Sequence, residues 1–308
     1  MDDESGRQAD KPLVGRIRLA ADLQALGVQP GGVLMVHASI SALGWVIGGS
    51  GAVVLALLDA LGPDGTLMAY TGWEDDSFDL ESWSAERRAA YEADLPAFDP
   101  RTAEAVHANG RLPERIRTWP GAVRSRHPEA GMVALGPRAA WLTADHPWDD
   151  AYGPGSPLAN LVAAEGHVLM LGAPLSTVTL LHHAEATARV PDKRRVAYRM
   201  PLLEDGRTVW RAFEDIDTAN GAFPYERLAD EIAATPGMDS EPDAFAAIAL
   251  QALAAGIGNR GTVGAANSAL FPAAALHRFA ERWLEERFGS DGDERDGGSS
   301  SPTPAGDS

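Results

Sequence analysis

The sequence has 308 residues, 45% hydrophobic and 23% charged, which is typical of a globular protein with a sizeable core. Its 26 Lys and Arg against 44 Asp and Glu give a formal net charge of −18, which argues against nucleic-acid binding and favours cationic partners. The chain has no cysteine and no run of the roughly 18 apolar residues that a membrane helix requires, so we expect no disulfide, thiolate metal site or membrane span.

The two ends of the chain are polar. Residues 1–6 lack the basic and apolar segments of a secretory signal, so we expect a cytoplasmic protein. We expect residues 1–12 to form a disordered arm and residues 289–308, rich in Gly, Ser, Pro and Asp, to form a disordered tail, because neither buries enough apolar surface to offset chain entropy. Residues 13–288 are then a single domain.

Strand and helix patterns alternate in the first part of this domain. Residues 16–27 have helical spacing and end at a glycine, and residues 33–36 form a short apolar run typical of a strand buried on both faces. Residues 52–61 predict a helix closed by Gly-Pro, and residues 67–70 predict the next strand. This order favours parallel pairing with crossover helices.

A segment rich in acidic and aromatic side chains interrupts this alternation at residues 73–100. An insertion of this length in a compact domain is usually functional or mobile. The candidates in this segment for binding a cationic ligand are Glu74, Asp75, Asp76 and Asp99, together with the aromatic Trp73.

The alternation returns in the second half. Strands are predicted at residues 132–135 and 168–171, and a hairpin at 195–200 and 208–213 around Glu204-Asp205-Gly206. Helices are predicted at 158–164, where Ser156 is a plausible cap, and at 177–190, 245–255 and 273–288, the last two flanking a Gly/Asn-rich connection. We therefore predict an α/β fold with a mixed, largely parallel central sheet and flanking helices.

Several familiar motifs are absent or misplaced. Residues 256–261 match G-x-G-x-x-G but follow a predicted helix, whereas the dinucleotide fingerprint follows a strand, so we interpret them as a helix end and a loop. There is no P-loop, no G-x-S-x-G elbow and no H-E-x-x-H, and we expect no metal.

Four segments carry candidate chemistry. His37-Ala38-Ser39, at a strand end and followed by small residues, would let backbone N–H groups approach an anion, or would form an ordinary turn. Residues 124–128 (RSRHP) would hold phosphates or form a solvated loop. In residues 171–191, His182 and Glu185 are three apart and share a helix face, as a catalytic or a surface pair. Residues 214–217 (EDID) would orient a histidine, bind substrate cations or form a solvated turn.

These segments together resemble the aminoglycoside 3-N-acetyltransferase family. The matching stretches, which cover most of residues 20–220 in the family's order, are GVQPGGVLMVHASISALGWVIGG, LGPDGTLMAYTGWEDD, PAFDP, RSRHPEAGMVALGP, GSPLANL, GHVLMLGAPLSTVTLLHHAEATARVPDKR and the EDIDT turn. The resemblance implies a fold distinct from the GNAT acetyltransferases. It also implies acetyl-CoA as donor and the 3-amino group of a 2-deoxystreptamine ring as acceptor.

The resemblance also implies roles for individual residues. It places the catalytic histidine at His182 and its carboxylate partner near Asp215, with Glu185 and Asp217 lining the acceptor side. The residues that it places on the CoA side are His37, Ala38, Ser39, Leu43, Gly44, Ser125, Arg126, His127, Ser176, Thr177 and Thr179. We expect the acidic insertion to bind the cationic acceptor.

The mechanism expected on this basis is direct transfer in a ternary complex. His182 removes a proton from the acceptor amine, Asp215 holds its tautomer, and the amine attacks the thioester. Three alternatives remain: the same fold acylating another amine, a non-catalytic protein that binds polycations, and a hydrolase that uses Ser39 or Ser156. We expect a monomer or a homodimer that binds no nucleic acid.

Overall fold

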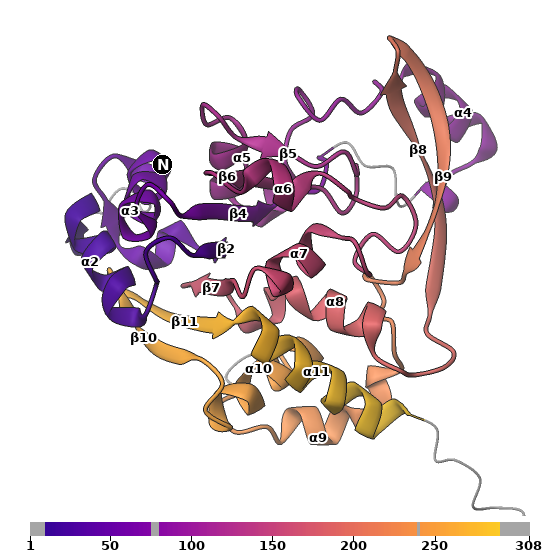
Figure 1. Ribbon diagram of the computed structural model, residues 1–308. Helices are drawn as coiled ribbons and strands as arrows, with labels where there is room; N and C mark the ends of the chain where they lie inside the picture. Colours follow the sequence, from indigo (N-terminus) through magenta and orange to yellow (C-terminus); the bar gives the residue numbers. More distant parts are fainter. Residues whose placement is uncertain (1–9, 75–79, 239–240, 290–308) are drawn as a thin grey trace, which may run out of the picture.

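A mixed sheet of seven strands lies at the centre of the computed structural model, which describes residues 10–74, 80–238 and 241–289 (Figure 1). The strand order is β10-β11-β7-β2-β4-β6-β5. The strands are β2 (Val33–Ala38), β4 (Thr66–Tyr70), β5 (Val123–Arg124), β6 (Met132–Leu135), β7 (His167–Leu171), β10 (Asn259–Val263) and β11 (Ala266–Pro272).

The predicted mixed α/β fold is confirmed, with parallel pairing confined to the centre. Strand β2 pairs in parallel with β4 and with β7, whereas the β4–β6, β6–β5, β7–β11 and β11–β10 pairs are antiparallel. Five of the seven strands consequently run in one direction, and β6 and β11 run in the other. The carboxyl ends of β7, β2 and β4 therefore meet at one edge of the sheet.

Helices cover both faces of this sheet, which explains the continuous apolar runs in the central strands. One face packs against α2 (Arg16–Leu26), α3 (Gly49–Leu61) and α5 (Arg111–Arg117), and Leu34 and Val36 point to this side. Met35 and Met170 point to the other side. That side is covered by α6 (Ala139–Thr143), α7 (Pro157–Ala163), α8 (Leu180–Thr187), α10 (Ala244–Ala254) and α11 (Ala273–Phe288).

A long hairpin stands beside the sheet (Figure 1). Its strands β8 (Arg195–Glu204) and β9 (Arg207–Ile216) are longer than predicted, and they join at the predicted turn, where Asp205 and Gly206 have φ angles of 48° and 74°. Positive φ at both central residues is the type I′ geometry that suits Asp-Gly.

The insertion at residues 73–100 packs against this hairpin. It contains a helix that we did not predict, α4 (Ala85–Asp94), with Ser84 accepting a hydrogen bond from the Arg87 N–H as its cap. Phe98 forms an isolated bridge to Leu202, and the Trp73 side chain lies 5.4 Å from Phe98 between ring centroids. Trp73 and Phe98 therefore belong to a small core that the insertion shares with the hairpin.

The largest difference from the predictions is in the Gly/Asn-rich connection. Residues 256–258 turn, but β10 and β11 form most of 259–272, so the predicted loop is in part an antiparallel ribbon. The G-x-G-x-x-G match at 256–261 runs from the turn after α10 into β10. The helix predicted at 177–190 is only α8, preceded by a 3₁₀ turn at Leu175–Thr177. The remaining short elements are β1 (Leu13–Val14), β3 (Trp45–Val46), α9 (Ala229–Ala233) and 3₁₀ turns at Ile40–Leu43, Leu80–Ser82, His107–Asn109 and Tyr225–Leu228.

Within the described ranges, no helix has the length and apolar character needed to cross a bilayer. Most of the arm and tail predicted at the two ends of the chain, residues 1–9 and 290–308, lies outside the described residues.

Candidate active site

A cleft of about 960 Å³ opens at the carboxyl ends of β2, β4 and β7. Open sheets of this kind bind ligands beyond the carboxyl ends of their strands. The end of β2 contributes His37, the end of β4 contributes Tyr70, and the segment after β7 leads into α8, which contributes His182. Most of the lining thus comes from segments far apart in the sequence.

His182, the third residue of α8, faces this cleft and is held by Glu185 one turn later. Its Nδ1 lies 2.7 Å from Oε2 of Glu185, whose side chain is only 1% exposed. A carboxylate in contact with Nδ1 accepts a hydrogen bond, so Nδ1 carries the proton and Nε2 keeps its lone pair. The second Glu185 oxygen, Oε1, accepts a hydrogen bond of 2.7 Å from the hydroxyl of Tyr225.

Two aromatic rings fix the imidazole in place. The Tyr152 ring lies 5.2 Å from that of His182 between centroids, and Phe245 of α10 approaches its face edge-on at 4.8 Å. The His182 side chain keeps 20% of its surface exposed, and it lines the cleft. A positioned imidazole with a free nitrogen facing a cavity has the geometry of a general base.

The predicted pairing of His182 with Asp215 is wrong. Asp215 is buried at the end of β9, where its carboxylate accepts hydrogen bonds from the Ala151 N–H at 2.6 Å and the Tyr198 hydroxyl at 3.0 Å. The bond from Ala151 joins the hairpin to the loop before α7, and the bond from Tyr198 lies within the hairpin. Burial is the main cause that raises the pKa of Asp215 from its ordinary 3.8 to about 7, and the two hydrogen bonds oppose the shift.

We expect Asp215→Asn to flatten the dependence of stability on pH. Because the folded pKa is raised, the folded state holds a proton that the unfolded state releases as the pH rises above 4, so the wild-type free energy of unfolding falls between about pH 4 and pH 7. At about 1.4 kcal/mol per pKa unit, the fall is at most about 4 kcal/mol. Urea unfolding at pH 5 and pH 8 measures this fall in the free energy of unfolding. The control is Asp217→Asn, because Asp217 is a half-buried neighbour of Asp215. Parallel curves for wild type and Asp215→Asn would contradict the assignment.

The floor of the cleft carries a carboxylate that sequence reasoning missed. Glu129, which follows the RSRHP segment, is 8% exposed and lines the cleft. The Tyr152 hydroxyl donates to its two carboxylate oxygens at 3.0 and 3.2 Å, and the Tyr70 hydroxyl donates to its backbone carbonyl at 3.0 Å. Tyr152 therefore contacts His182 with its ring and Glu129 with its hydroxyl. The sequence identifies the preceding residues 124–128 as a phosphate-binding candidate but does not single out Glu129.

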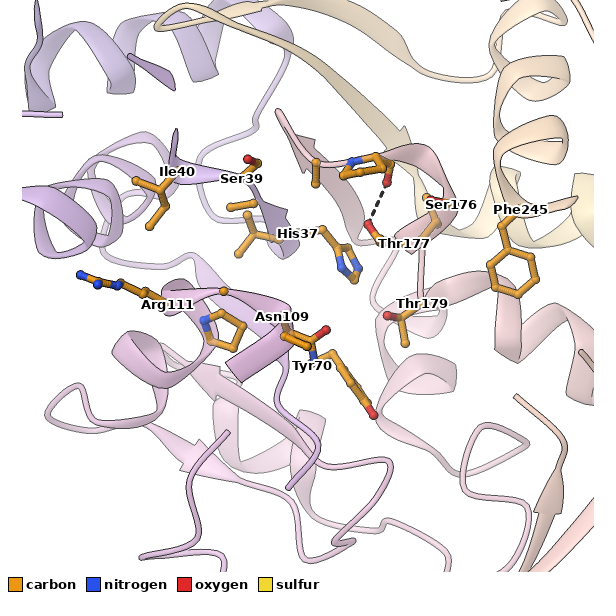
Figure 2. Close-up of a pocket in the computed structure, with 18 of the residues that line it drawn as sticks. His37, Ser39, Ile40, Tyr70, Asn109, Arg111, Ser176, Thr177, Thr179 and Phe245 are labelled. Atoms are coloured by element: carbon orange, nitrogen blue, oxygen red, sulfur yellow. Dashed lines mark hydrogen bonds between the residues drawn. The ribbon is translucent and has the colours of Figure 1, made fainter. Parts of the chain in front are cut away.

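His37 lies in the middle of the cleft, with Arg111 and Ile40 on one side and Phe245 on the other (Figure 2). Its Nε2 is buried and has no hydrogen-bond partner among the described residues. Burial lowers the pKa of His37 from 6.5 to about 4, so the ring is neutral at physiological pH. A buried polar atom without a partner is costly unless a ligand supplies one.

The end of the cleft beyond His37 is cationic. Arg111, at the start of α5, lines it together with Gly49 and Ser50 at the N-terminus of α3 (Figure 2 shows Arg111). The guanidinium of Arg115 lies over the first turn of α3, 3.2 Å from where a side chain on Gly51 would begin. Neither arginine forms an ion pair within the described part of the chain.

The residues predicted to bind the donor divide into two groups. His37, Ala38, Ser39, Ser176, Thr177 and Thr179 line the cleft, and Thr177 donates a hydrogen bond of 2.8 Å to the Pro174 carbonyl (dashed in Figure 2). The other five, Leu43, Gly44, Ser125, Arg126 and His127, do not line the cleft. Leu43 is buried in the core, and Gly44 packs against Pro12 in the left-handed region, at φ 100°.

The RSRHP segment lies outside the cleft, with Arg124 at the end of β5 and the other four residues in the loop that follows. Ser125 and His127 are buried, with Ser125 Oγ 2.9 Å from Nδ1 of His146 and His127 Nδ1 accepting from the Ala130 N–H. Arg126 is exposed but lies over the Trp148 ring. The polar atoms of Ser125 and His127 are therefore used in contacts within the fold.

The residues predicted to bind the acceptor are mostly elsewhere. Trp73 is 2% exposed in the core of the insertion, Glu74 accepts a hydrogen bond from the His107 N–H, and Asp99 pairs with Arg101. Asp217 bonds to Asn220 but directly precedes Thr218, which lines the cleft. Asp75 and Asp76 lie outside the described residues. Over the described ranges, no three His, Asp or Glu side chains are grouped so as to hold a metal ion.

The chain matches a family model over residues 35–285, and that model describes aminoglycoside 3-N-acetyltransferases. A curated relative, aminoglycoside N(3)-acetyltransferase VIII of Streptomyces fradiae, is 53% identical over 90% of this chain and 93% of its own length. The corresponding enzyme III of Pseudomonas aeruginosa is 49% identical, over 86% and 92%.

Solved structures agree with this similarity. The aminoglycoside acetyltransferase AAC(3)-Xa superposes with a TM-score of 0.85 at 51% identity, covering 92% of this chain and 97% of its own. AAC-IIIb, solved with CoASH, gives 0.80 at 43% identity over 91% and 99%. AAC-VIa, solved with sisomicin, gives 0.80 at 40% identity over 91% and 100%.

Proposed function

Because this chain belongs to the aminoglycoside 3-N-acetyltransferase family, we propose that it transfers the acetyl group of acetyl-CoA to the 3-amino group of a 2-deoxystreptamine aminoglycoside. His182 is the general base and Glu185 is its carboxylate partner. The observation that carries this assignment is the contact of 2.7 Å between His182 Nδ1 and the buried Glu185 carboxylate, with the imidazole facing the cleft.

The donor occupies the cationic end of the cleft. CoA carries phosphates, and the N-terminus of a helix together with arginine side chains is a suitable environment for them. Arg111, Ser50 and Gly49 supply that environment, and AAC-IIIb, a relative solved with CoASH, supports a CoA donor in this fold. The thioester then lies toward the centre, where the unpartnered Nε2 of His37 is placed to bond to the donor.

The acceptor enters at the opposite side, beside His182, Glu129 and Thr218. A polycationic sugar is attracted by the negative field of a chain with a net charge of −18. Glu129 is the only acidic residue among the described residues that line the cleft, and Asp217 directly precedes the lining residue Thr218 in the sequence. Sisomicin bound to AAC-VIa supports an aminoglycoside in this fold.

The chemistry follows from the tautomer of His182. Nε2 accepts a proton from the acceptor nitrogen as that nitrogen attacks the thioester carbonyl, and Glu185 stabilises the imidazolium that forms. A nitrogen–carbon bond forms and the carbon–sulfur bond breaks. The imidazolium then returns the proton to the CoA sulfur. Because the sequence contains no cysteine, no thiol of the protein carries the acetyl group.

The test is CoA release from acetyl-CoA with and without an aminoglycoside, with the acetylated position read by NMR. We expect release only with the acceptor, and acetylation on the 3-nitrogen. Arg111→Ala should raise the KM for acetyl-CoA about 10-fold and leave the acceptor KM unchanged, because a charged hydrogen bond contributes about 1.5–3 kcal/mol. The exposed Arg138 on the other face of the sheet serves as control in Arg138→Ala.

Other results would select the alternatives. Release without acceptor would indicate a hydrolase, and antibiotic binding without release would indicate a polycation-binding protein. Transfer to another amine but not to aminoglycosides would show an N-acyltransferase of the same fold with a different acceptor.

A further inference from the structure

A tyrosine from a distant segment completes the contacts of the His182–Glu185 pair. Glu185 has two oxygens: Oε2 contacts Nδ1 of His182, and Oε1 accepts from the Tyr225 hydroxyl, both at 2.7 Å. We propose that Tyr225 is a positioning residue for acetyl transfer, which holds Glu185 in the rotamer that selects the basic tautomer of His182. This inference rests on the proposed function of that pair.

The direction of the Tyr225 hydrogen bond is set by its surroundings. Burial, and then the negative charge of Glu185, raise the pKa of the Tyr225 phenol well above its ordinary value, so the hydroxyl keeps its proton and donates it. Glu185 is 1% exposed, and a buried carboxylate needs both oxygens to be hydrogen-bonded. Without the hydroxyl, one oxygen of Glu185 would have no donor and the carboxylate would gain freedom to rotate away from Nδ1.

Tyr225 itself is firmly placed. It begins the 3₁₀ turn Tyr225–Leu228, and its ring lies edge-on to Phe288 at 5.6 Å and Phe223 at 6.1 Å between centroids. A side chain at Gly221, which has a φ of 84°, would start 3.0 Å from the Tyr225 ring. The turn and the end of α11 thus hold the Tyr225 hydroxyl against Glu185, which is 40 residues away in the sequence.

The test is Tyr225→Phe, which removes only the hydroxyl. We expect kcat to fall about 10-fold, with the KM values of both substrates unchanged within about twofold, because the ring still fills its site and only the base is less well oriented. The matched control is Tyr198→Phe. Tyr198 donates in the same way to another buried carboxylate, that of Asp215, but does not line the cleft. That variant should keep kcat within about twofold.

A double-variant cycle separates positioning from a general loss of structure. If Tyr225 acts through Glu185, Tyr225→Phe should cause no further loss of kcat in a Glu185→Gln enzyme. The same fold-loss in both backgrounds, or equal losses in Tyr225→Phe and Tyr198→Phe, would overturn the proposal. Full activity of His182→Ala would instead refute the proposed function, so the two failures are distinguishable.

Discussion

His182→Ala should lower kcat by about 10²–10⁴-fold, the usual contribution of a positioned general base. The neutral acceptor amine gains a positive charge on its nitrogen as it bonds to the thioester carbon, so attack requires a group that removes a proton from that nitrogen. His182 faces the cleft between Tyr152 and Phe245, and its Nδ1 is occupied by Glu185. The substitution removes the base and leaves the cleft walls in place.

Steady-state kinetics with acetyl-CoA and an aminoglycoside measure this loss, and thermal unfolding checks the fold. His167→Ala is the control, because His167 begins β7 at the opposite end of the strand from the cleft. It should keep kcat within about twofold. Wild-type turnover in His182→Ala would remove His182 from the mechanism.

The sequence predicted the local part of this site and missed the part made by tertiary contacts. His182 and Glu185 are three residues apart on a helix, so their contact follows from helical geometry. Asp215 comes from a hairpin whose path is not set by local pattern, and its bonds go to Tyr198 and Ala151 instead. Tyr225 had no signal at all, because a single tyrosine after a proline marks no motif.

The difference between local pattern and tertiary contact also explains which strands could be predicted. The central strands were predictable because strands covered on both faces are continuous apolar runs, as in residues 33–36 and 168–171. Strand β10 was not, because four of its five residues are exposed at the sheet edge and read as a polar loop. Strand β10 forms because its backbone pairs with the neighbouring strand β11, and its own side chains give no strand pattern.

The basic RSRHP segment shows how burial changes the meaning of a motif. In the structure, the Arg124 guanidinium donates to the carbonyls of Gly72 and Ala103, and burial lowers its pKa to about 10. It therefore ties the segments on either side of the insertion to the sheet edge. Residue types alone do not distinguish this internal role from phosphate binding. The arginine at the cleft, Arg111, stands in a segment that the sequence analysis did not single out.

Glu185→Gln should reduce kcat nearly as much as His182→Ala, by about 10²–10⁴-fold, although the two side chains have the same shape. The hydroxyl of Tyr225 donates to the position of Oε1, so the amide oxygen is expected there, and the amide NH₂ then faces His182. Because the amide NH₂ is a donor, Nδ1 of His182 must accept from it. The imidazole proton then lies on Nε2, which loses the lone pair that accepts the proton in the reaction.

Glu185→Ala is the informative comparison, because alanine imposes no tautomer on His182 and should lower kcat less than glutamine does. Glu281→Gln is the matched control: Glu281 contacts His277 Nδ1 at 3.4 Å on α11, outside the cleft, and kcat should stay within about twofold. The measurement is kcat of the Glu185→Gln, Glu185→Ala and Glu281→Gln variants at constant pH. If glutamine at position 185 is more active than alanine, Glu185 contributes packing and charge but does not select the tautomer of His182.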